Sequence, residues 1–125
     1  MVTGELAYVT GATGLVGLHL VERLVNEGWR VRALVLPSED ASPLETLGVE
    51  CVRGDITHAP ETLREALAGV TRVFHCAAWV ADLADREEMA RVNVQGLRHL
   101  LEATRGIDLK RFVFVGSIVV HGDRD

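Results

Sequence analysis

Three glycines at fixed spacing, Gly11, Gly14 and Gly17, follow the apolar run Leu6–Val9 and precede a helical pattern. A strand that turns abruptly into a helix directs backbone N–H groups and the positive end of the helix at one point. Glycine in such a turn lets a pyrophosphate approach the backbone, because a Cβ atom would block it. The glycines and their strand-to-helix context together predict a phosphate-binding loop.

Three polar residues stand at further positions where a contact is expected. Asp55 and Ser117 each come shortly after an apolar strand pattern. Asn93 falls at helical spacing on an apolar helix face, where a polar group needs a partner. Each also has a structural interpretation, because aspartate and serine are common turn residues and an asparagine can cap a buried backbone group. The residues themselves leave both interpretations open.

The composition is that of a soluble globular domain and excludes several function classes. The chain has 125 residues, of which 48% are hydrophobic and 25% charged, enough for one modest domain with a core. Its net charge of −5 argues against a general nucleic-acid-binding surface. No apolar run reaches the roughly 20 residues that span a bilayer, and no signal-peptide pattern is present, so a cytoplasmic protein is expected. The two cysteines and the scattered histidines suggest neither a disulfide nor a metal site.

Strand and helix patterns alternate from one end of the chain to the other. Short apolar runs rich in valine predict strands over 6–10, 31–36, 49–53, 72–77 and 111–116. Helices are predicted over 15–27, 43–47, 60–68 and about 86–104, with Ser42 capping the second of them. Alternation implies parallel pairing, hence a doubly wound α/β sheet with strand order 3-2-1-4-5. A ligand crevice is then expected between the first and fourth strands, beyond their carboxyl ends.

Six ordered segments resemble the extended short-chain dehydrogenases/reductases, in particular the NAD-dependent epimerase/dehydratase and dihydroflavonol-reductase-like branch. These segments are Thr10–Gly17, Val31–Pro37, Gly54–Thr57, Val73–Ala78, Val92–Gly96 and Arg111–Ser117. The resemblance covers essentially the whole chain and implies that residues 1–125 form an NAD(P)-binding Rossmann domain. It also implies the N-terminal portion of a longer enzyme, truncated before the C-terminal strands and the substrate-binding part.

The resemblance further implies a set of cofactor contacts around the expected crevice. Asp55 is expected to accept a hydrogen bond from the adenine amino group while Ile56 packs on the ring, and Asn93 to contact the nicotinamide side. Ser117 is implied as the catalytic serine that hydrogen-bonds the reacting hydroxyl or carbonyl group of the substrate. The other positions implied as cofactor contacts are Gly11, Thr13, Gly14, Leu15, Val16, Gly17, Leu36, Cys76, Ala77, Ala78 and Trp79.

The choice between NAD and NADP depends on the residues that follow the second strand. Leu36 stands where NADP-dependent members of this branch often carry arginine. Glu39 and Asp40 lie just beyond it and would repel a 2′-phosphate, whereas Arg32 within the strand can point either way. NAD is therefore favoured over NADP.

The catalytic tyrosine and lysine of the family are missing from this chain. The family moves a proton with a tyrosine whose pKa is lowered by a lysine four residues later. The only tyrosine here is Tyr8, inside the first strand, and the only lysine is Lys110. The parent enzyme is expected to move a hydride between a nicotinamide and a sugar-nucleotide or carbonyl/hydroxyl substrate, with a homodimer possible, while the chain alone is expected to be inactive. The alternative is a non-catalytic dinucleotide-binding sensor or scaffold.

Overall fold

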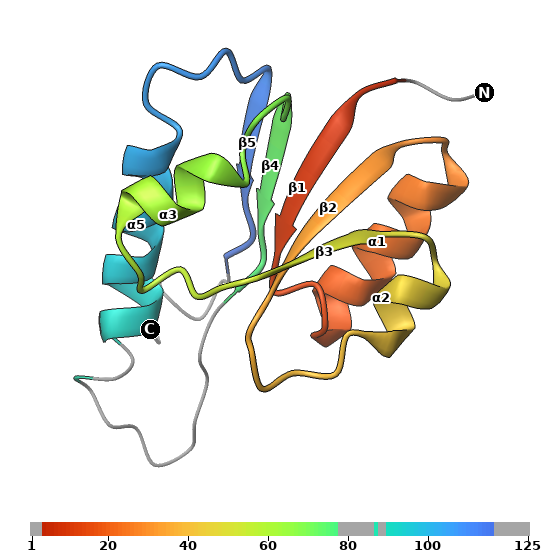
Figure 1. Cartoon of the computed structure of the whole chain (residues 1–125), viewed down its shortest axis with the longest axis horizontal. Helices are drawn as coiled ribbons and strands as arrows, with labels where there is room; N and C mark the ends of the chain where they lie inside the picture. Colours follow the sequence, from red (N-terminus) through yellow and green to blue (C-terminus); the bar gives the residue numbers. More distant parts are fainter. Residues whose placement is uncertain (1–3, 78–86, 88–89, 117–125) are drawn as a thin grey trace, which may run out of the picture.

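The computed structural model describes residues 4–77, 87 and 90–116, which form a five-stranded parallel sheet between two layers of helices (Figure 1). The sheet order is β3-β2-β1-β4-β5, and every neighbouring pair is parallel. The strands are β1 (Leu6–Thr10), β2 (Arg30–Val35), β3 (Glu50–Arg53), β4 (Arg72–His75) and β5 (Arg111–Phe114). The predicted doubly wound α/β fold and its strand order are confirmed.

Helices cover both faces of the sheet because the strands carry apolar side chains on both faces. The first layer holds α1 (Leu15–Asn26) and α2 (Ser42–Thr46), and the second holds α3 (Pro60–Glu65) and α5 (Gly96–Ala103). A π-helical turn, η1 (Arg91–Gln95), leads directly into α5. All of β1 is buried, and alternate side chains of this central strand enter the two cores, as the period of a strand requires.

The structure corrects the predicted ends of three elements. The predictions for the fourth and fifth strands were too long at their carboxyl ends, because β4 ends at His75 and β5 at Phe114. The prediction that Ser42 caps a helix was wrong. Ser42 is the first residue of α2, Ala41 precedes it as the N-cap, and the Ser42 hydroxyl donates to the carboxylate of Asp40 instead.

Tyr8 lies at the centre of β1, with none of its surface exposed. Its ring packs in the core between the sheet and the layer of α3 and α5. Its hydroxyl has no hydrogen-bond partner among the described residues. Burial raises the pKa of the Tyr8 phenol well above its usual range, with a smaller opposing effect from the charge of Arg32.

The outer strand β5 leaves apolar side chains uncovered at the sheet edge. Phe114 is 57% exposed, and Val113 is 37% exposed. At the amino end of the same strand, Lys110 is paired with Glu5, which also binds Arg72. Lys110 is thereby held at the pole of the sheet opposite the carboxyl ends of the strands.

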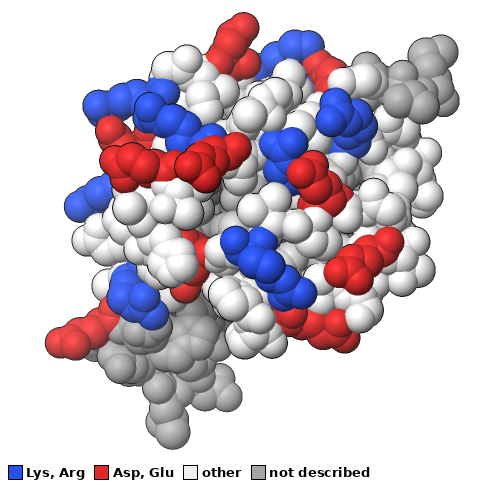
Figure 2. Space-filling view, viewed as in Figure 1, with Lys and Arg blue, Asp and Glu red and all other residues white. Residues whose placement is uncertain are grey.

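Charges of both signs are mixed on the molecular surface. On the face seen in Figure 2, basic and acidic side chains are interspersed, and neither kind gathers into an extended patch. Within the described part of the chain, no helix has the length and apolar character that crossing a membrane requires.

Candidate functional site

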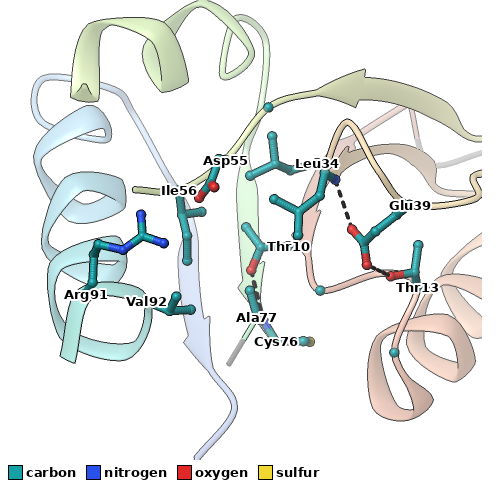
Figure 3. Close-up of a pocket in the computed structure, with 14 residues that line it drawn as sticks. Thr10, Thr13, Leu34, Glu39, Asp55, Ile56, Cys76, Ala77, Arg91 and Val92 are labelled. Carbon is teal, nitrogen blue, oxygen red and sulfur yellow. Dashed lines mark hydrogen bonds between the residues drawn. The ribbon is translucent and has the colours of Figure 1, made fainter. Parts of the chain in front are cut away.

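A cavity of about 400 Å³ lies at the carboxyl ends of the strands (Figure 3). The glycine-rich loop, the loop after β2, the turn after β3, the end of β4 and the first residues of η1 all contribute to its wall. Of the predicted contact residues, the cavity is lined by Gly11, Thr13, Gly14, Leu36, Asp55, Ile56, Cys76 and Ala77. The fold therefore brings together, around one cavity, residues separated by more than half of the sequence.

The three glycines of the loop differ in the space that surrounds them. Gly11 has a φ of +67°, and a Cβ atom there would lie 2.6 Å from the backbone nitrogen of Ala77. A Cβ atom at Gly17 would lie 2.0 Å from the carbonyl oxygen of Gly11. Gly14 has an ordinary φ of −78°, and its Cβ would meet only that same carbonyl oxygen, at 3.4 Å. Gly14 lines the cavity, so the space beside it is open to a ligand.

Gly14 is also the N-cap of α1, whose first turn lacks a side-chain cap and carries no acidic residue. Leu15 and Val16 in this turn are 79% and 55% exposed; they do not line the cavity themselves, but they directly follow Gly14, which does. Uncapped N–H groups at a helix N-terminus attract anions. The loop is thus suited to a phosphate group, in the manner that its spacing predicts.

Thr10 fixes the end of β4 against the end of β1. Its Oγ1 accepts hydrogen bonds from the backbone N–H groups of Cys76 and Ala77, at 3.2 Å each. The hydroxyl hydrogen is then free to donate to Nδ1 of His75, 2.7 Å away. Burial lowers the pKa of His75, which keeps the ring neutral and able to accept this bond. This network, which the sequence does not reveal, holds Cys76 and Ala77 at the cavity wall.

Asp55 presents a carboxylate to the cavity from the turn after β3. Its Oδ1 accepts hydrogen bonds from the backbone N–H and the hydroxyl of Thr57, both at 2.8 Å. Partial burial alone would raise the pKa of Asp55, but these two bonds and the nearby charges of His58 and Arg91 outweigh it and lower the pKa. The group is therefore ionised at neutral pH and acts only as an acceptor.

Glu39 brings a second carboxylate to the cavity, from the loop after β2. One of its oxygens accepts a hydrogen bond from the Thr13 hydroxyl at 2.5 Å, and the other from the backbone N–H of Leu36 at 2.9 Å. Arg53 supports this loop by donating to the carbonyl oxygens of Leu36 and Glu39. Glu39 was predicted only to repel a phosphate; the structure places it in the wall itself.

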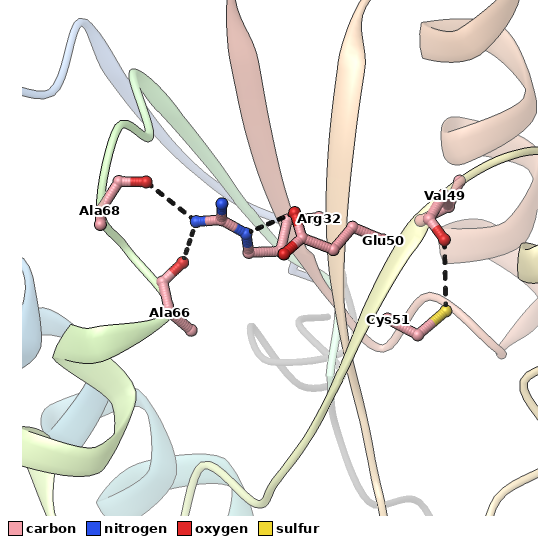
Figure 4. A network of polar contacts seen from close by, with 6 residues as sticks. All are labelled: Arg32, Val49, Glu50, Cys51, Ala66 and Ala68. Carbon is pink, nitrogen blue, oxygen red and sulfur yellow. Dashed lines mark hydrogen bonds and ion pairs between the residues drawn. The ribbon is translucent and has the colours of Figure 1, made fainter.

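Arg32 does not line the cavity, and its side chain extends toward Ala66 and Ala68 (Figure 4). Its guanidinium bonds the carboxylate of Glu50 on β3 and the carbonyl oxygens of Ala66 and Ala68 at the end of α3. The orientation that the sequence left open is thereby decided, and Arg32 joins the sheet to α3 rather than facing a ligand.

On η1, the residues that line the cavity differ from the predicted contact residue, Asn93. Arg91 and Val92 line the cavity, while Asn93 lines a separate shallow hollow with Leu97 and Leu101. A π-helical turn contains more residues than an α-helical one, so it changes which side chains face inward, and the 3.6-residue period does not reveal this. The predicted contact of Asn93 with a nicotinamide stays a prediction. Three further predicted residues, Ala78, Trp79 and Ser117, lie outside the described residues.

Metal ligands do not gather at this site or elsewhere in the described ranges, where no three His, Cys, Asp or Glu side chains come together. Both cysteines are free thiols there, and burial raises the pKa of Cys76 at the cavity wall. The wall thus presents two carboxylates, one guanidinium, two threonine hydroxyls, one thiol and apolar side chains.

Comparisons with known proteins agree with this geometry. Residues 7–125 match the NAD dependent epimerase/dehydratase family. The chain is 40% identical to sterol demethylase protein B of Methylococcus capsulatus, over 87% of this chain and 33% of that protein. It is 38% identical to a 4-hydroxy-2-methyl-3-oxo-4-farnesyl-3,4-dihydroquinoline-1-oxide ketoreductase of Stigmatella aurantiaca, over 93% of this chain and 34% of that protein.

A similar solved structure is that of a short-chain dehydrogenase/reductase superfamily protein from Agrobacterium tumefaciens with bound NAD. It is 37% identical, has a TM-score of 0.74, and is matched over 90% of this chain and 33% of that one. The chain spans about a third of the length of the curated relatives it matches.

Proposed function

Because the chain belongs to the NAD-dependent epimerase/dehydratase family, we propose that its cavity binds the adenosine and diphosphate groups of NAD. The observation that carries this proposal is Gly14, which no contact within the described chain requires to be glycine. It stands at the uncapped end of α1, beside the cavity. A diphosphate can occupy the space that a side chain at Gly14 would fill. Its oxygens can accept hydrogen bonds there from the backbone N–H groups of Leu15 and Val16.

The rest of the cavity fits the adenosine part of the same ligand. Ile56 is buried to 4% exposure and offers an apolar surface for the adenine ring, beside the acceptor group of Asp55. Glu39 offers carboxylate oxygens to the ribose hydroxyls. Calorimetric titration of the chain with NAD tests the proposal, which fails if no saturable binding is observed.

We propose NAD rather than NADP, because Glu39 would face a 2′-phosphate with like charge and Arg32 is occupied elsewhere. Replacing Leu36, which is 40% exposed at the cavity wall, by arginine is expected to raise the NADP-to-NAD affinity ratio. A charge-assisted hydrogen bond to the phosphate corresponds to about a tenfold change or more. The ratio is measured by competitive titration of the two cofactors.

Leu101→Arg is the matched control for this prediction. Leu101 is 48% exposed on α5, outside the cavity. An arginine there adds the same positive charge to the protein without placing it at the cavity wall. An equal rise of the ratio in both variants would mean that net charge, and not the position of Leu36, decides the preference.

For the whole protein we propose a reductase, epimerase or dehydratase that transfers hydride between the nicotinamide and a sugar-nucleotide or carbonyl/hydroxyl substrate. NAD when bound supplies the hydride acceptor or donor. The chain's own residues bind the adenosine half and exclude water from it, and Ser117 is proposed to hydrogen-bond the reacting oxygen. A non-catalytic sensor is the second candidate, since the described residues form the cavity while Tyr8 and Lys110 do not line it.

A further inference from the structure

Arg91 is the only cationic side chain among the described residues that line the cavity. It is the first residue of the π-helical turn η1 and extends toward Asp55 and Ile56 in Figure 3. Its Nη1 donates a hydrogen bond to the Thr57 hydroxyl at 3.1 Å. Arg91 therefore reaches across from the second helical layer to the turn that carries the acceptor carboxylate.

The hydrogen bonds of Thr57 form a directed relay from Arg91 to Asp55. The Thr57 hydroxyl has a single hydrogen, which it donates to Oδ1 of Asp55 at 2.8 Å, so it can only accept from Arg91. The guanidinium polarises this hydroxyl and strengthens its bond to the carboxylate. As a result Oδ1 is held in place, while Oδ2 makes no hydrogen bond within the described part of the chain.

The same turn is held a second time by α5. Nδ1 of His99 donates to the carbonyl oxygen of Ile56 at 3.1 Å. A Cβ atom at Gly96 would lie 2.5 Å from Cδ1 of Ile56, so the helix backbone rests directly on that side chain. With Ile56 held by α5, Arg91 adds a restraint on the rotation of the Asp55 carboxylate through Thr57.

We propose that Arg91 is a positioning residue for base recognition, which through Thr57 aims the free oxygen of Asp55 at the exocyclic amino group of adenine. This inference rests on the proposed function. An ionised carboxylate can only accept, so a purine with a carbonyl oxygen at that position meets repulsion. Hypoxanthine is such a purine, and it carries a ring N–H beside the carbonyl. A carboxylate free to rotate can accept from this N–H instead, so discrimination depends on how firmly Asp55 is held.

The test compares the affinities for NAD and for nicotinamide hypoxanthine dinucleotide, measured by calorimetric titration. The unmodified chain is expected to prefer NAD by about tenfold or more, as for one hydrogen bond to a charged group. Arg91→Met and Thr57→Val are each expected to lower this preference by about three- to tenfold. The double variant is expected to lower it no further, because both changes break one relay.

Two control variants are expected to keep the preference for NAD over nicotinamide hypoxanthine dinucleotide. Thr57→Ser keeps the hydroxyl and rescues the loss seen with valine. Arg98→Met removes an arginine from the same helical segment, where Arg98 lines the separate hollow. Equal weakening of both dinucleotides by Arg91→Met, with an unchanged ratio, would overturn the positioning role and leave the proposed function standing. Absence of binding of either dinucleotide to the unmodified chain would overturn both.

Discussion

Gly14→Val is expected to lower the affinity of the chain for NAD by about a hundredfold or more. The two methyl groups of valine would occupy the open space beside Gly14, where the diphosphate is proposed to lie against the N-terminus of α1. Losing two charge-assisted hydrogen bonds, at roughly 1.5–3 kcal/mol each, accounts for an effect of this size. Calorimetric titration with NAD measures it, and an unchanged affinity would contradict the proposed site of the diphosphate.

Gly17→Ala is the matched control for this prediction, since it lies one turn further along the same loop and helix. Its Cβ would meet the carbonyl oxygen of Gly11 at 2.0 Å, whereas a Cβ at Gly14 meets it at 3.4 Å, an ordinary contact. The Gly17 variant is therefore expected to lose thermal stability, and the Gly14 variant to keep its melting temperature while losing the ligand. An equal loss of melting temperature in both variants would mean that Gly14 has a structural role.

The 125-residue chain is expected to bind NAD without catalysing hydride transfer. The family's acid–base pair is a tyrosine and a lysine four residues apart, and neither candidate here can reach the cavity. Tyr8 is fully buried within β1, and Lys110 is paired with Glu5 at the opposite pole of the sheet. General acid–base catalysis contributes typically about 10²–10⁴-fold, so its absence is expected to lower the rate by at least that factor.

The measurement is nicotinamide absorbance with the chain saturated in NAD and offered sugar-nucleotide and alcohol substrates. Turnover that persists after repurification, and that disappears in Gly14→Val, would contradict the prediction. Binding without turnover, combined with turnover by a longer polypeptide that includes this chain, would favour the enzyme over the sensor.

The sheet and the glycine loop were predictable because local patterns determine them. Apolar runs separated by helical periods imply parallel strands, and parallel pairing with right-handed crossovers leaves few strand orders. The six segments that resemble the short-chain dehydrogenases/reductases indicated the family correctly, and the match over residues 7–125 confirms it. The order of elements is a property of the sequence pattern, so it needs no knowledge of side-chain contacts.

The details of the cavity were less predictable because they depend on contacts between distant residues. Thr13 and Glu39 are 26 positions apart, and Thr10 and His75 are 65 apart, so no local pattern links them. Arg91 was missed for another reason: it lies in a π-helical turn, where the α-helical period that singled out Asn93 does not show which side chains line the cavity. The available sequence signal for Arg91 was a charged side chain two positions before the predicted contact residue Asn93.

The burial of Tyr8 gives this chain an internal optical probe of its own folding. An exposed phenol ionises near pH 10, but the pKa of Tyr8 is raised by burial, so the folded chain keeps its proton where the unfolded chain releases it. The contribution to stability is complete below about pH 10, and above it the free energy of unfolding falls by about 1.4 kcal/mol per pH unit. Because the chain has one tyrosine and that residue is fully buried, the appearance of phenolate absorbance below the raised pKa of the folded chain reports unfolding. A ligand that binds the folded cavity then moves the absorbance midpoint to higher pH, which turns a residue remote from the chemistry into a label-free readout of cofactor binding.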